Sequence, residues 1–214
     1  FVSLMNTMSN VWDALRHAAF QVASIITTTG YASADFDQWS QTCKTVLVIL
    51  MFVGACAGST GGGMKVSRLV IMFKTVVKEL SSYFHPKNIK KINMDGKPVE
   101  HEVVRAVNVY FITIMGIFTL SVFLVSLEGR DLVTNFTAVA SCLNNIGPGL
   151  SEVGPTRNFG GLTGFTKYVL MFDMLAGRLE LFPLLLIFNP GVYRDMIMGA
   201  WRSIKRRRQE RRAN

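Results

Sequence analysis

The sequence has few side chains of the kinds that carry covalent chemistry or hold structural metals. Its 214 residues include three cysteines and three histidines, and neither set forms a CxxC pair or a metal-ligand spacing. The cysteines, Cys43, Cys56 and Cys142, lie far apart in or beside apolar runs. We therefore expect packed thiols, and the sequence argues against a disulfide-rich domain and against nucleophilic or metal-dependent catalysis.

Charged side chains are also scarce. Asp, Glu, Lys and Arg make up 17% of the chain, whereas 50% of the residues are apolar, including 15 Phe and 11 Met. This composition is too apolar for a soluble domain and indicates a membrane protein. The net charge is +9, but the basic residues flank apolar segments in two blocks. Such blocks indicate membrane topology and do not indicate nucleic-acid binding.

Two apolar segments are too short to cross a bilayer. Residues 11–26 provide roughly a dozen to fifteen apolar positions before TTTG, whereas a transmembrane helix needs about 20. Residues 131–143 end similarly, in NNIGPG, and Asp131 suits the N-terminus of that helix. Each segment predicts a re-entrant half-helix that stops where polar backbone lines a cavity.

Three longer apolar segments accompany the short ones. Residues 106–127 contain no charge and give the clearest crossing. Residues 45–57 are interrupted by GSTGGG at 58–63 before the apolar pattern resumes, which predicts a broken transmembrane helix. Residues 166–188 are apolar but include Asp173, Arg178 and Glu180.

These segments form an internal repeat. Each half has a short helix, a polar loop with one central glycine and a long outgoing helix, and only the second half contains its incoming helix. We expect an all-α membrane protein made of helix–pore-loop–helix repeats, as in potassium channels, with one broken transmembrane helix. The expected parts are a repeat lacking its first helix (1–83), a linker (84–102), a complete repeat (103–205) and a basic tail (206–214). Since the sequence starts at Phe1 without an initiating Met, and no secretory signal is visible, we expect an internal or C-terminal part of a longer protein.

The distribution of basic residues predicts the orientation. Lys and Arg gather between residues 65 and 105 and in the terminal run KRRRQERR, whereas Asp35, Asp37, Glu128, Asp131 and Glu152 belong to the other side. By the positive-inside bias, the basic side and the C-terminus are cytoplasmic. Both glycine-containing loops then enter the membrane from outside.

The two loops suit the binding of a dehydrated alkali cation. Main-chain carbonyls can replace the water shell of the ion, and glycine permits the backbone angles that align successive carbonyls. The C-terminal ends of the short helices also favour a cation. The expected filter residues are Thr28, Thr29, Gly30, Asn145, Ile146 and Gly147. The alternative is that each glycine only caps a helix, but two loops at equivalent places favour the filter.

Four motifs occur in order along the chain: TTTGYAS, GACAGSTGGGMK, NNIGPG and AGRLELFPLL. Together they resemble the Trk/Ktr/HKT superfamily of potassium uptake proteins over essentially the whole chain, and the glycine-rich segment is most similar to the TrkH/TrkG branch. The resemblance implies four repeats around one pore, of which this chain contains the third, without its first helix, and the fourth. It also implies potassium, and rubidium, as the permeating ion, with looser rejection of sodium. The implied potassium ligands are Thr28, Thr29, Asn145 and Ile146.

The glycine-rich segment has several interpretations. A phosphate-binding loop fails on spacing, because Met64 separates Gly63 from Lys65. Helix packing through GxxxG is the structural alternative. The resemblance implies an intramembrane gate beneath the filter. The expected gate residues are Gly58, Ser59, Thr60, Gly61, Gly62 and Gly63.

Charged residues near the loops are further candidates. The resemblance implies that Arg178 lies near the gate and hinders cation passage, whereas the structural alternatives are snorkelling or an ion pair with Asp173 or Glu180. Solvated loop carboxylates are the favoured interpretation of Asp35 and Asp37, which could otherwise concentrate cations at the pore mouth. Asp13 and His17 are expected to pair with each other or to cap a helix.

The expected function is inward movement of potassium along the membrane potential, in the bacterial inner membrane and without catalysis. The resemblance adds a homodimer and a cytosolic, TrkA-like nucleotide-binding ring as partners. A membrane enzyme acting through Asp173 and Glu180 would need a nucleophile or metal constellation, which the sequence does not offer. A secondary cation transporter would need oppositely oriented repeats, whereas these run in the same sense. A structural membrane subunit is the other alternative.

Overall fold

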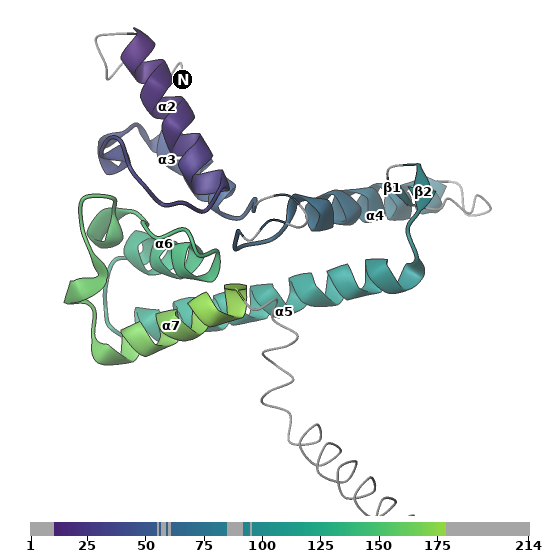
Figure 1. The fold of residues 1–214 in the computed structure, drawn as a ribbon. Coiled ribbons are helices and arrows are strands. Elements are labelled where there is room, and N and C mark those ends of the chain that lie inside the picture. Colours follow the sequence, from purple (N-terminus) through teal and green to yellow (C-terminus); the bar gives the residue numbers. More distant parts are fainter. Residues whose placement is uncertain are drawn as a thin grey trace, which may run out of the picture. The chain divides into compact units, whose positions relative to one another are not determined.

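The structure is a computed structural model that describes residues 11–54, 56, 59, 61–84, 92–94 and 96–178. All of them belong to one unit, Phe1–Arg178. The elements, drawn in Figure 1, are α2 (Val11–Ile26), η1 (Phe36–Gln38), α3 (Gln41–Met51), α4 (Val66–Phe84), β1 (Asn93–Met94), β2 (Lys97–Pro98), α5 (His101–Ser126), α6 (Leu132–Leu143), η2 (Ser151–Val153), η3 (Phe159–Gly161) and α7 (Gly164–Arg178).

The two short helices occur where the sequence predicts them. Helix α2 has the expected bounds, and α6 begins one residue later than expected because Asp131 is its N-cap. The Asp131 carboxylate accepts a hydrogen bond of 3.2 Å from the Val133 N–H, which satisfies one of the free N–H groups of the first turn. The predicted capping role of Asp131 is therefore confirmed.

The long helix after the first loop is broken, but earlier than the glycine run indicates. Helix α3 ends at Met51 and α4 begins at Val66, so the break starts before the predicted position at Gly58. The cause is a contact within the break: the Gly54 N–H donates to the Met64 carbonyl at 2.9 Å. This bond joins the two ends of the break and draws the chain out of its helix.

Helix α5 is longer than the charge-free segment that predicts it. It starts at His101, five residues before Ala106, because the short β1–β2 hairpin ends at Pro98 and Glu100 supplies an extended N-cap. The Lys74 ammonium donates to the Asn93 carbonyl at 2.7 Å and holds this hairpin against α4. By length and composition, α5 is the one described helix that could cross a membrane.

The helices of the second half form the centre of the described unit. Helices α5, α6 and α7 pack against one another, α4 lies along α5, and α3 contacts both α2 and α6 (Figure 1). The rings of Phe52, Phe118 and Phe136 join α5 and α6 to the end of α3, with centroids 5.1 to 6.2 Å apart. Helix α6 is exposed in its first turn, at Leu132 and Val133, and is buried over most of its length from Thr134 to Leu143.

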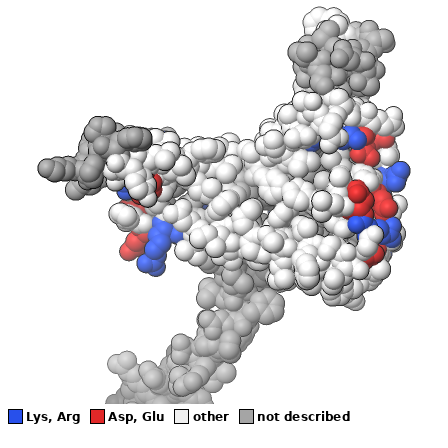
Figure 2. All heavy atoms as spheres, turned by 180° about the vertical axis from the view of Figure 1, so that it is seen from behind, with Lys and Arg blue, Asp and Glu red and all other residues white. Residues whose placement is uncertain are grey.

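The outer surface of these helices is apolar. Phe73, Val77, Ile112 and Phe123 project from α4 and α5 with more than half of their surface exposed. On the face drawn in Figure 2, the charged side chains gather mainly at two ends and leave a largely uncharged surface between them. An uncharged band between charged ends is the pattern that a bilayer requires.

Candidate functional site

The first predicted filter loop begins at the C-terminus of α2. The Thr28 N–H donates to the Ile25 carbonyl at 3.1 Å and the Thr29 N–H to the Ser24 carbonyl at 2.9 Å. These two bonds define a Schellman motif, and Thr28, with φ of +56°, occupies its left-handed position. A β-branched residue with this φ is rare, so the surrounding structure must hold it there.

The second loop repeats this geometry at the C-terminus of α6. Asn145 has φ of +55° and donates its N–H to the Cys142 carbonyl at 3.0 Å, while the Ile146 N–H donates to the Ser141 carbonyl at 2.9 Å. The two loops thus leave their helices with the same backbone path.

The glycines that follow are not the left-handed residues of these two caps. Gly30 and Gly147 come two residues after the left-handed positions and have φ of +75° and +117°. A Cβ atom on Gly30 would overlap the Ile146 carbonyl oxygen. Gly30 is therefore required both by its backbone angle and by the close approach of the second loop, so helix capping alone does not account for this glycine.

The two loops border a common hollow of about 650 Å³. The residues of the predicted filter that line it are Thr28, Thr29, Asn145, Ile146 and Gly147. Leu170, Met171 and Met174 of α7 form an apolar wall. Gly30 does not line this hollow, but its contact with Ile146 joins the two loops.

The glycine-rich segment lies against the end of α6. Gly58 and Thr60 fall outside the described residues, whereas Ser59, Gly61, Gly62 and Gly63 are described. The Ser59 hydroxyl accepts the Gly61 N–H at 3.0 Å. A Cβ atom on Gly62 would lie 2.7 Å from the Asn145 Cβ, and one on Gly63 would lie 2.8 Å from the Asn144 Oδ1.

This close approach explains why the segment consists of glycines. No described residue between α3 and α4 is helical, so the described part of this segment is a loop. Gly58, which both GxxxG matches share, lies outside the described residues. The described glycines let a loop backbone contact Asn144 and Asn145, which start the second predicted filter loop.

Helix α7 reaches the same place. The Asn145 side-chain amide donates to the Met174 carbonyl at 3.1 Å, and a Cβ atom on Gly177 would overlap the Leu143 carbonyl oxygen. Arg178 follows as the last described residue of α7 and has an exposed side chain. The C-terminal end of α6 is thus the meeting point of the glycine-rich segment, the second filter loop and the end of α7.

Asp173, a proposed partner of Arg178, is held by another helix. Its side chain is fully buried, and its Oδ1 atom accepts the Ser121 hydroxyl of α5 at 2.6 Å. Glu180, the other proposed partner, lies outside the described residues. The bond between Ser121 and Asp173 therefore serves the packing of α5 on α7.

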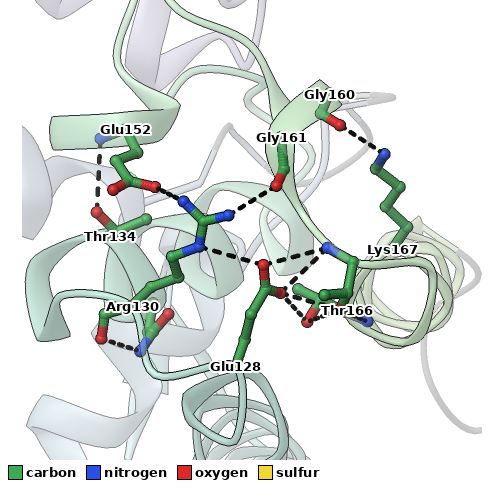
Figure 3. A network of polar contacts seen from close by, with 10 residues as sticks. Glu128, Arg130, Thr134, Glu152, Gly160, Gly161, Thr166 and Lys167 are labelled. Carbon is green, nitrogen blue, oxygen red and sulfur yellow. Dashed lines mark hydrogen bonds and ion pairs between the residues drawn. The ribbon is translucent and has the colours of Figure 1, made fainter.

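A network of polar contacts lies where α5 ends and α7 begins (Figure 3). The Glu128 carboxylate, at the end of α5, accepts hydrogen bonds from the Thr166 hydroxyl at 2.6 Å and from the Thr163 hydroxyl at 3.0 Å. Arg130 donates to Glu128 at 3.2 Å, pairs with Glu152 and donates to the Gly161 carbonyl at 2.7 Å. The network connects the start of α6, the loop after the filter and the start of α7.

The network shifts the pKa of its members. Burial disfavours the ionised Glu128, but the hydrogen bonds from Thr166, Thr163 and Arg130 outweigh this effect and lower the pKa of Glu128. The neighbouring Glu152 carboxylate is the main cause of the raised pKa of Arg130. Sequence analysis missed this network, because the Glu128 and Thr166 segments are distant along the chain and carry no shared motif.

The remaining candidates make local contacts. Asp13 forms an ion pair of 3.6 Å with Arg16, while the His17 ring nitrogen lies 2.9 Å from the Ser33 hydroxyl. The predicted pairing of Asp13 with His17 is therefore wrong.

Two further carboxylates, Asp35 and Asp37, make contacts at η1. Asp35 accepts the Asp37 N–H at 3.2 Å and the Gln38 amide at 2.9 Å, and Asp37 pairs with Lys44 at 3.4 Å.

Comparisons with known proteins bear on this geometry. A family model described as TrkH, cation transport protein, matches residues 3–198. The Trk system potassium uptake protein TrkH of Halomonas elongata is 37% identical over 182 residues, covering 85% of this chain and 37% of the relative. TrkG of Escherichia coli K12 is 34% identical over 189 residues, covering 88% of this chain and 38% of the relative.

A solved structure also matches. The crystal structure of the potassium transporter TrkH from Vibrio parahaemolyticus has a TM-score of 0.82 and 36% identity, and the match covers 90% of this chain and 41% of that one. This likeness confirms the predicted fold class of a helical membrane protein with pore-loop repeats. The chain spans about two fifths of the length of these relatives.

Proposed function

Because the chain belongs to the TrkH family of cation transport proteins, we propose that it forms the third and fourth pore repeats of a membrane potassium uptake protein. The remaining repeats would come from the rest of the full-length protein, since the chain spans 37 to 41% of its relatives. Family membership sets the enzyme alternative aside, because the family consists of transport proteins.

The observation that carries the proposal is the repeated backbone geometry of the two loops. Both short helices end in a Schellman motif with a non-glycine residue at the left-handed position, and both continue to a glycine of positive φ. A helix cap alone does not need this glycine two residues after the cap position. An extended strand of carbonyl groups that faces an ion does need it.

In this proposal the main-chain carbonyls of the loops replace the water shell of potassium. The filter residues are Thr28, Thr29, Gly30, Asn145, Ile146 and Gly147, with potassium held mainly at Thr28, Thr29, Asn145 and Ile146. The C-terminal ends of α2 and α6 add partial negative charge at the loops, which favours a cation without a full carboxylate. Rubidium, similar in size and charge, would also pass.

The glycine-rich segment would act as the gate. Its residues Gly62 and Gly63 contact the start of the second filter loop, so a displacement of this loop would change the pathway directly below the filter. Arg178 follows Gly177, which contacts the same end of α6. A positive charge there would oppose the passage of a cation until the segment moves.

The basic residues predict the membrane orientation of the chain, and the family resemblance suggests its partners. By the positive-inside bias, the basic residues between 65 and 105, which include the β1–β2 hairpin, and the C-terminus would face the cytoplasm of a bacterium. We expect the full-length protein to form a homodimer and to be regulated by a cytosolic, TrkA-like nucleotide-binding ring that contacts this side.

The test is potassium-dependent growth and rubidium uptake in a transport-deficient cell that expresses the full-length protein with Gly147→Ser. Gly147 has φ of +117°, a region that serine rarely adopts, so we expect relaxed selectivity or lost uptake. Gly161→Ser is the matched control, because a Cβ atom at Gly161 meets nothing within 4 Å. Equal uptake by the Gly147 variant and the wild type, with unchanged selectivity, would refute the filter.

A further inference from the structure

Two hollows between α4 and α5 meet to form one groove. The first, of about 510 Å³, lies between α4, the β1–β2 hairpin and the start of α5. The second, of about 410 Å³, lies between facing parts of α4 and α5. Thr75, Glu79 and Asn108 border both hollows. We call this continuous surface the α4–α5 groove.

The two ends of the groove differ in chemistry. Its hairpin end is lined by the basic side chains of Lys78 and Arg105 and by the carboxylates of Glu79 and Glu100. The other end is lined by Met72, Val76, Leu80, Tyr83, Phe111 and Ile112. The groove is thus amphipathic along its length, and so a matching ligand must be amphipathic too.

The position of α5 sets the depth of the groove. Arg105 is the last charged residue before the charge-free segment 106–127, so it lies at the boundary of the hydrocarbon layer. On α5, the first hollow is lined by residues between Glu100 and Asn108, and the second by Asn108, Phe111 and Ile112, so the second reaches further into the charge-free segment. The polar end therefore lies at the level of lipid head groups and the apolar end at the level of acyl chains.

We propose that the α4–α5 groove binds one phospholipid, phosphatidylethanolamine. Lys78 and Arg105 bind its phosphate, Glu79 and Glu100 accept hydrogen bonds from its ammonium group, and an acyl chain occupies the apolar end. Phosphate is a strong acceptor for Arg and Lys, and carboxylates form charge-assisted hydrogen bonds with an ammonium N–H.

The balance of charge decides the head group. Two basic and two acidic side chains line the polar end. A zwitterionic head group satisfies both signs, whereas phosphatidylglycerol leaves the carboxylates without a counter-charge. Phosphatidylcholine is zwitterionic but has no N–H to donate. The groove therefore distinguishes lipids by charge and by hydrogen bonding.

The bound lipid would link two functional parts. Helix α4 follows the glycine-rich segment directly, and α5 leads into the second filter loop through α6. A lipid between α4 and α5 would restrain these helices relative to each other. This inference requires that α5 spans the membrane, but it does not depend on the filter assignment.

The test uses the full-length protein in detergent, with native mass spectrometry after addition of each of the three phospholipids. We expect one retained phosphatidylethanolamine per subunit and weaker retention of the other two lipids. Lys78→Gln combined with Arg105→Gln should lower the affinity for phosphatidylethanolamine about ten- to thirty-fold. Ile112→Trp, which fills the apolar end, should abolish retention without changing any charge.

Two control variants lie outside the groove. Arg157→Gln removes an exposed basic residue in the loop between η2 and η3, and Leu120→Trp adds bulk to another exposed part of α5. Both should retain phosphatidylethanolamine as the wild type does. Glu79→Gln with Glu100→Gln should remove the preference for phosphatidylethanolamine over phosphatidylcholine.

Equal retention of all three lipids by the wild type, or unchanged retention in the Lys78/Arg105 and Ile112 variants, would overturn the proposal. If these variants retain the lipid but lose a cytosolic protein partner, the groove is a protein interface instead of a lipid site. Rubidium uptake by the Gly147 variant is measured separately, so failure of the filter leaves the lipid result standing.

Discussion

Single residues determine how the two predicted filter loops fit together. Thr28 and Asn145 take the left-handed positions that glycine usually occupies, while the glycines stand two residues later. At Gly30 the positive φ coincides with contact to the Ile146 carbonyl. The backbone angle and the contact are two distinct reasons for a glycine at this position. Gly129 has nearly the same φ but open space around it, so a comparison of the two glycines separates these reasons.

Gly30→Ala should reduce potassium uptake at least about tenfold, because its methyl group would push the second loop away and misplace the carbonyls. Gly129→Ala is the control, since Gly129 has φ of +76°, nearly that of Gly30, but open space around it. Rubidium uptake at equal protein level compares the two. Equal uptake would show that the contact between the loops does not matter.

Glu128 makes the polar network around Arg130 sensitive to acid. Its pKa in the folded protein lies below the ordinary value of 4.5, so its ionised form stabilises the fold above that value. This stabilisation is lost as the pH falls from about 4.5 through the lowered pKa. Glu128→Gln should lower the unfolding free energy at neutral pH by about 1 to 3 kcal/mol, because hydrogen bonds to a charged acceptor are lost.

The measurement is thermal unfolding of the full-length protein between neutral pH and pH 3. The wild type should lose stability in the acid range, and the Glu128 variant should lose less. Glu102→Gln is the matched control, because Glu102 lies exposed in the first turn of α5. A Glu128 variant with the same pH profile as the wild type would contradict the assignment.

At the scale of elements, the packing of α7 on α6 depends on one glycine. Gly177→Ala should displace α7, because a Cβ atom there would overlap the Leu143 carbonyl oxygen. We expect a loss of about 1 to 3 kcal/mol of stability, as in other overpacked sites. Gly116→Ala in α5 is the control and should be neutral or slightly stabilising, since a Cβ atom at Gly116 meets nothing within 4 Å. Thermal unfolding distinguishes the two, and equal melting temperatures would exclude the tight contact.

The elements also show what sequence reasoning can and cannot reach. The bounds of α2 and α6 were predictable because apolar length and a polar stop are local signals. The end of α3 was not predictable, because Met51 is followed by residues that could continue a helix. The hydrogen bond from the Gly54 N–H to the Met64 carbonyl, which ends the helix, is not visible in the sequence. The contact of Glu128 with Thr166 was likewise invisible, since it depends on how α5 and α7 pack.

At the scale of the whole molecule, the chain spans about two fifths of the length of its relatives. We expect it to supply two of four repeats, the third of them without its first helix. Three segments that are separate in sequence, namely the glycine-rich segment, the second filter loop and the end of α7, meet at the end of α6. In the proposed gate, closure of the pathway would therefore depend on contacts from both expected repeats. Arg178 is the charged residue that this convergence places beside the contact.

Arg178→Ala in the full-length protein should raise potassium flux in the resting state by about tenfold, equal to about 1.4 kcal/mol of barrier, because a repelling charge is removed. Arg178→Lys keeps the charge and should keep the low resting flux. Arg157→Ala removes a charge from an exposed loop and should change nothing. Flux is measured in proteoliposomes without the nucleotide-binding partner. Unchanged flux in the Arg178→Ala variant, beside a filter that responds to Gly147→Ser, would mean that Arg178 serves the structure of α7 and that the gate is the glycine-rich segment alone.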